Sequence, residues 1–203
     1  AIDRAGLVGQ DGATHHGAFD LSYMRCIPNL IIAAPSNEND CRQMLVSAYN
    51  HKGPSAVRYP RGEGIGVRIE PELIGVEIGK GKVVREGCDI TILNFGVLLT
   101  EAEKAAETLN ATVADMRWVK PLDTDLICEL AKTHSILITV EENVVAGGAG
   151  SAVAEFLTEQ GLDIEIRHVA IDDRFIDHAS QGETRADAGL SCDDILSKAG
   201  ASH

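Results

Sequence analysis

The sequence predicts an α/β fold, in which a short first unit precedes a larger second one. Continuous apolar runs of strand length, such as Leu30–Ala34, are typical of parallel strands covered on both faces. Stretches with apolar residues at helical spacing separate these runs, and a segment rich in Gly, Glu and Pro lies between the two units. Strands that alternate with helices favour a mostly parallel, doubly wound sheet.

The first unit holds two expected helices and two expected strands. Apolar spacing predicts a helix over residues 17–24, followed by the strand Leu30–Ala34. We expect Ser36 to cap the next helix, which ends near Tyr49, because a serine side chain accepts a hydrogen bond from a backbone N–H of the first turn. Residues 55–58 predict a second strand, which leads into Tyr-Pro-Arg-Gly.

The second unit repeats the alternation of strand and helix. Strands are expected at 89–95, 111–116, 135–140 and 163–169, and helices at 100–109, 123–131 and 150–160. Glu141 and Glu142 follow the third of these strands, and adjacent strand residues point to opposite faces, so the two cannot form one carboxylate dyad. The glycines at 147–150 fit neither nucleotide-binding fingerprint and are expected to open a helix.

Charge and composition exclude several classes of partner. The net charge of −13 disfavours nucleic acid and anionic membranes. Residues 1–62 carry six Lys/Arg against five Asp/Glu, and residues 63–203 carry twelve against 26, so a phosphate site is expected in the first unit. No apolar run approaches the roughly 20 residues of a membrane span. Five scattered cysteines without CxxC spacing indicate reduced thiols in a cytoplasmic protein.

Residues 3–17 contain Arg4, Asp11 and His15 among four glycines. Glycine allows close backbone approach, so this segment is expected to form a loop shaped against a ligand. Asp11 and His15 are four residues apart, and a helical turn would place both on one side. Arg4 and Arg61 each follow an expected strand end, where ligands bind in open α/β sheets. A guanidinium there can present a planar fork to phosphate.

Plainer interpretations of these residues stay open. A lone loop arginine is usually a surface ion pair, and Arg58 is expected to be structural. His15 and His16 could form an exposed pair or a metal site with Asp11. Zinc, however, needs a third or fourth ligand nearby, and the sequence supplies none there, so no metal ligand is assigned.

Three motifs together resemble the thiamine diphosphate-dependent transketolase superfamily, and most specifically its 1-deoxy-D-xylulose-5-phosphate synthase family: Asp-Arg-Ala-Gly at 3–6, Asp-Gly-Ala-Thr-His at 11–15 and Tyr-Pro-Arg-Gly at 59–62. The resemblance implies the end of a pyrimidine-binding domain at 1–62, a linker at 63–78 and a complete transketolase C-terminal-like domain at 79–203. Ile2 looks like the tail of a strand, so we expect a C-terminal fragment of a longer protein.

The resemblance also implies a reaction. In that family pyruvate condenses with D-glyceraldehyde 3-phosphate to give 1-deoxy-D-xylulose 5-phosphate and CO2, which feeds isoprenoid, thiamine and pyridoxal biosynthesis. Arg4 and Arg61 would hold the acceptor phosphate, while Asp11 and His15 would act at the forming bond. His178 receives no role, because Ala179 follows it where the family commonly has glycine.

Thiamine diphosphate and magnesium are the cofactors that the resemblance implies for a full-length, cytoplasmic, homodimeric transferase. The Gly-Asp-Gly motif that holds them is absent from this sequence, so cofactor-binding residues stay unassigned. We expect the fragment alone to bind neither cofactor and to be inactive. The alternatives are a transketolase or 2-oxo acid dehydrogenase β-type subunit, and a non-catalytic dimerisation or scaffold module.

Overall fold

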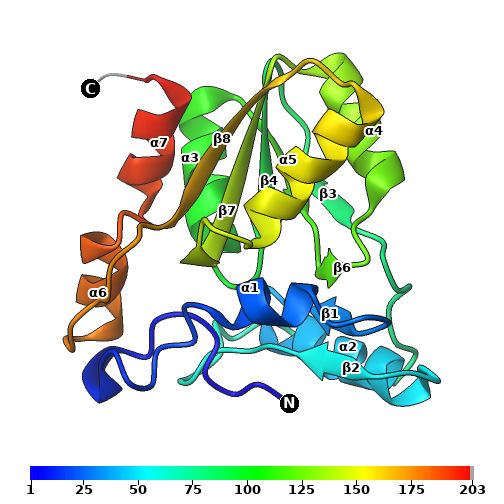
Figure 1. Ribbon diagram of the computed structural model, residues 1–203, viewed down its shortest axis with the longest axis vertical. Coiled ribbons are helices and arrows are strands. Elements are labelled where there is room, and N and C mark those ends of the chain that lie inside the picture. The colour runs from blue at the N-terminus through cyan, green and yellow to red at the C-terminus, as the bar shows by residue number, and fades with distance from the viewer. Residues whose placement is uncertain (202–203) are drawn as a thin grey trace.

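The computed structural model describes residues 1–201 and contains two sheets with helices around them (Figure 1). The strands are β1 (Ile31–Ala33), β2 (Ser55–Val57), β3 (Lys82–Arg85), β4 (Ile90–Phe95), β5 (Thr112–Asp115), β6 (Trp118–Lys120), β7 (Ile136–Val144) and β8 (Glu165–Ile171). The α-helices are α1 (Asp20–Arg25), α2 (Glu38–Asn50), α3 (Leu99–Leu109), α4 (Thr124–Thr133), α5 (Ala149–Gln160), α6 (Gln181–Asp187) and α7 (Cys192–Ala199), and a 3₁₀ turn, η1, covers Gly9–Asp11.

The larger sheet has the strand order β3-β5-β4-β7-β8. Its four strands β5, β4, β7 and β8 run parallel, as the sequence predicts, and β3 is added antiparallel at one edge. Helices α3 and α7 cover one face, while α4 and α5 cover the other (Figure 1). The apolar strand residues are therefore buried from both sides, which explains their continuous runs.

The smaller sheet has the order β2-β1-β6. Strands β1 and β2 are parallel, and Ile2 adds a parallel bridge to Arg58, as expected for a strand tail. The third strand, β6, comes from the second unit and pairs antiparallel with β1. This strand was not predicted from the sequence, because it is only three residues long and its partner lies far away along the chain.

Several local expectations also need correction. Asn37, rather than Ser36, caps α2 by accepting a hydrogen bond from Asp40 N at 2.9 Å. Ser36 instead donates its hydroxyl to the buried Asp115 carboxylate at 2.7 Å. Strand β7 extends to Val144, beyond the expected end at residue 140, because its last residues are buried between the two units. Strand β3 and helices α6 and α7 were not predicted.

Residues 63–78 lie along α2 without forming a helix or strand of their own, as far as the described chain shows. Polar side chains of α2 satisfy their backbone groups. Glu38 accepts from Gly66 N at 2.7 Å, and Ser47 both donates to and accepts from the backbone of Val76. The segment is thus held as an extended strap on α2.

Candidate functional site

The loops that carry Arg4 and Arg61 lie next to each other. Ala5 N donates to Tyr59 O at 3.0 Å, one step beyond the bridge between Ile2 and Arg58. Both loops therefore leave the smaller sheet at the same edge, as parallel strand ends do. The fold brings together two arginines that are 57 positions apart.

The Asp11 carboxylate lies between the two guanidinium groups. Its Oδ2 atom accepts a hydrogen bond from Arg4 Nη1 at 2.5 Å, and the same oxygen accepts from Arg61 Nη1. These hydrogen bonds, from Arg61 first and Arg4 second, hold the pKa of Asp11 below its ordinary value. Two arginine forks thus converge on one anionic oxygen, which makes this an anion site that an internal carboxylate occupies.

Glycine at position 17 is required by the way in which the loop closes. Gly6 and Gly17 exchange backbone hydrogen bonds of 3.1 and 2.8 Å, which brings the two ends of the loop together. A Cβ atom on Gly17 would lie 1.9 Å from the carbonyl oxygen of Arg4, a distance that no side chain can adopt. The backbone of Arg4 is therefore fixed by direct contact with Gly17.

His15 lies exposed on the same loop, and its Nδ1 is 2.9 Å from the Thr14 hydroxyl. Among the hydrogen bonds of residues 1–201, none joins the His15 ring to Asp11. His16 has a backbone role instead, because its Nδ1 accepts from Val8 N at 3.0 Å. The structure thus brings Arg4, Arg61 and Asp11 into one cluster, and His15 is not joined to it by any of the hydrogen bonds of residues 1–201.

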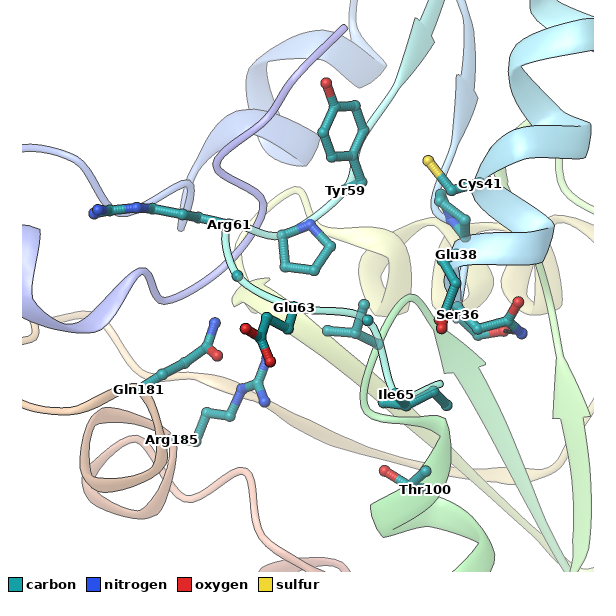
Figure 2. A pocket seen from close by; sticks show the side chains of 16 residues that line it. Ser36, Glu38, Cys41, Tyr59, Arg61, Glu63, Ile65, Thr100, Gln181 and Arg185 are labelled. Carbon is teal, nitrogen blue, oxygen red and sulfur yellow. Dashed lines mark hydrogen bonds between the residues drawn. The ribbon is translucent and has the colours of Figure 1, made fainter. Parts of the chain in front are cut away.

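Arg61 also lines a cavity of about 280 Å³. The wall opposite is formed by Gln181 and Arg185 of α6, which reach toward the segment that follows Arg61 (Figure 2). Neither residue was predicted from the sequence. The Ser180–Glu183 capping box that begins α6 could have predicted the helix, but it carries no information about where that helix packs.

Arg58 is structural, as predicted. It is 3% exposed and forms a buried ion pair with Asp20, with Nε to Oδ2 at 2.7 Å. Its Nη2 atom also donates to the carbonyl oxygens of Gly17 at 2.7 Å and Glu142 at 2.8 Å. The residue thus ties the end of the Arg4 loop to β7.

Glu141 and Glu142 point to opposite faces of β7, so the two do not form a dyad, as the strand geometry predicts. Glu141 accepts from Ala149 N at 2.8 Å and Gly150 N at 2.7 Å at the start of α5. Its complete burial raises its pKa to about 7. Glu142 forms an ion pair with Arg185 at 2.8 Å.

Residues 1–201 contain no group of three or more His, Cys, Asp or Glu side chains placed to hold a metal ion. None of the helices that these residues form combines the length and the apolar character needed to cross a bilayer.

Family comparisons match both units. The family described as transketolase, C-terminal domain, matches residues 79–195, which is more than half of the chain. The chain belongs to the transketolase family. The family described as transketolase, pyrimidine binding domain, matches residues 1–65. The expected fold class is confirmed.

Curated relatives of this transketolase-family chain carry one description, 1-deoxy-D-xylulose-5-phosphate synthase. The relative from Vibrio vulnificus is 56% identical over 195 residues, which cover 96% of this chain and 31% of the relative. The relative from Photobacterium profundum is 59% identical over 183 residues, or 90% of this chain and 30% of the relative. The expected resemblance is confirmed, and the chain spans about a third of the length of these relatives.

A solved structure has the same architecture. It is described as a split gene transketolase, inactive beta4 tetramer, and it superposes with a TM-score of 0.82 at 32% sequence identity. The match covers 92% of this chain and 61% of that one. The arrangement of both units therefore occurs in a known transketolase.

Proposed function

We propose that the complete gene product is a thiamine diphosphate-dependent synthase that condenses pyruvate with D-glyceraldehyde 3-phosphate, releasing CO2 and 1-deoxy-D-xylulose 5-phosphate. The observation that carries the proposal is the convergence of Arg4 and Arg61 on one carboxylate oxygen of Asp11. A phosphate group matches such a pair better than a carboxylate does, because it offers more oxygens and more charge. The description of the curated relatives supports the same reaction.

In this proposal each residue has a separate task. The substrate phosphate replaces the Asp11 carboxylate between Arg4 and Arg61. Asp11, once released, accepts a hydrogen bond from a substrate hydroxyl. His15 exchanges a proton with an oxygen at the forming bond, which is the general acid–base role that histidine side chains fill most often.

The cofactors belong to the complete gene product in this proposal. Thiamine diphosphate, when bound, supplies the carbanion chemistry of the reaction, and magnesium would accompany its diphosphate. The described residues do not fit a magnesium site, because residues 1–201 place no suitable ligand cluster together. We therefore derive no step through the cofactor from this chain, and we expect residues 1–203 alone to be inactive.

The proposal is tested in the complete gene product with pyruvate and the triose phosphate. Arg4→Ala and Arg61→Ala should each raise the KM for the triose phosphate about tenfold to a hundredfold, since a hydrogen bond to a charged group contributes roughly 1.5–3 kcal/mol. Unphosphorylated glyceraldehyde should be used equally well by wild type and variants. Arg167→Ala, which removes an ion pair with Glu165 on β8, is the matched control. An unchanged KM in both site variants would refute the assignment.

Other substrates distinguish the competing functions. Transfer to lipoamide would support a 2-oxo acid dehydrogenase β-type subunit, and use of a ketose phosphate donor would support a transketolase. Absence of any turnover, together with a stable dimer in light scattering, would support a scaffold. We also propose that the complete gene product is a homodimer, which light scattering tests, and that it is cytoplasmic, which cell fractionation tests. The proposed domain limits are 1–62, 63–78 and 79–203, and limited proteolysis tests them.

A further inference from the structure

The loop that carries Arg4 and Asp11 packs against the second unit at Gly6. This glycine has a φ of +68°, and a Cβ atom there would lie 2.6 Å from the Cβ and Cδ atoms of Glu142. The loop backbone thus touches the end of β7 with no room for a side chain. Such a close approach transmits a shift of Glu142 directly to the loop.

Glu142 is held in one position by charge and burial. The residue is 2% exposed, and its Oε1 and Oε2 accept from Arg185 Nε at 2.8 Å and Nη2 at 3.1 Å. The Oε1 atom also lies 3.5 Å from the backbone N of Leu7. A bidentate pair of this kind fixes geometry as well as neutralising a buried charge.

The same backbone unit is held from α6. Gln181 Nε2 donates to Leu7 O at 3.0 Å, so the N–H and the C=O of Leu7 both face side chains of the second unit. Arg185 and Gln181 share the wall of the cavity that Arg61 lines. The Glu142–Arg185 pair therefore links β7 of the second unit to the cavity that Arg61 lines.

We propose that Glu142 is a positioning residue for the acceptor phosphate, acting through Gly6 and Leu7. It sets the place at which Arg4 meets Arg61, although its hydrogen-bond partners in the described chain are Arg185, Leu7 and Arg58 rather than Arg4 or Arg61. The inference rests on the proposed function for its kinetic consequence. The effect of Glu142 on the affinity of the loop for a phosphate anion can be measured separately, without turnover.

The test uses Glu142→Gln in the complete gene product. Glutamine keeps the shape and one acceptor oxygen but loses the charge that binds Arg185. Asp187→Asn is the matched control, because it removes the α6 carboxylate of an exposed ion pair with Arg174. Gln181→Ala is the second variant in case Glu142→Gln does not fold. The measurements are hydrogen exchange of residues 4–17 during titration with inorganic phosphate, and KM values for both acceptors.

We expect Glu142→Gln to speed exchange in residues 4–17 and to weaken phosphate affinity about three- to thirtyfold, the range typical of residues that act through others. The KM for the triose phosphate should rise by a similar factor. The KM for unphosphorylated glyceraldehyde and the values for Asp187→Asn should stay within twofold of wild type, taken as roughly the precision of such comparisons. Gln181→Ala should shift in the same direction.

Three results would overturn the inference: a wild-type loop that phosphate does not protect, a loop that exchanges equally in the Glu142→Gln and Asp187→Asn proteins, or a loosened loop with unchanged phosphate affinity. A wild-type protein that binds phosphate but makes no product from pyruvate and the triose phosphate would refute the proposed function alone. The phosphate titration would still decide the role of Glu142.

Discussion

Replacing Arg58 by methionine should unfold this chain at a much lower urea concentration. The guanidinium is 3% exposed and its partner Asp20 is 4% exposed. Methionine fills a similar volume but leaves the Asp20 carboxylate buried without its cation. It also removes the donor to the carbonyls of Gly17 and Glu142. Removing one partner of a buried pair costs about 3–5 kcal/mol, so we expect a loss of this size in the free energy of unfolding.

Urea unfolding followed by the fluorescence of Trp118 measures this loss. Trp118 is the single tryptophan of the chain, and it is fully buried in β6, a strand of the smaller sheet. The double variant Arg58→Met/Asp20→Asn should recover at least about 1 kcal/mol, because it removes the unpaired charge. Lys104→Met, which breaks an exposed pair on α3, should change stability by less than about 0.5 kcal/mol. An Arg58→Met protein within that same small range would refute the reasoning.

Two further perturbations test other parts of the structure. Burial, and to a lesser extent the nearby charge of Asp40, raises the pKa of Asp115 to about 7. The folded state therefore binds more protons than the unfolded state between pH 3.8 and 7, and stability falls as the pH rises through this window. Asp115→Asn should remove this slope, at most about 1.4 kcal/mol per pH unit, in urea titrations at several pH values; identical slopes would contradict it. Gly17→Ala should lower the free energy of unfolding by about 1–3 kcal/mol, because the new Cβ would meet Arg4 O. Gly182→Ala, whose Cβ would meet nothing within 4 Å, should leave stability unchanged. Equal melting temperatures of the two variants would contradict this expectation.

The larger sheet could be predicted because its parallel strands are buried on both faces and therefore read as apolar runs. Strands β3 and β6 lack that signal, since both are short edge strands and Pro121 follows β6 directly. The cap of α2 was misassigned by one residue because Ser36 and Asn37 are both good capping residues. Tertiary contact with Asp115 decides between them, since it engages the Ser36 hydroxyl.

The anion site could be predicted in part. Arg4 and Arg61 carry a local signal, because each follows a strand that ends at the same edge of a sheet. Glu142, Gln181 and Arg185 carry none, since they lie more than 80 positions from either arginine and belong to no recognisable motif. Only the packing of α6 and β7 against the loop reveals them.

Glu142 is linked to both parts of the Arg4 loop, directly at Leu7 and through Arg58 at Gly17. Its side chain reaches Leu7, and its backbone carbonyl accepts from Arg58, which in turn donates to Gly17. A single residue of the second unit thus stabilises the start and the end of a loop that belongs to the first. Because Arg4 lies two residues before the Gly6 end of that loop, its distance from Arg61 depends on contacts across the two units, and the anion site is a property of both together.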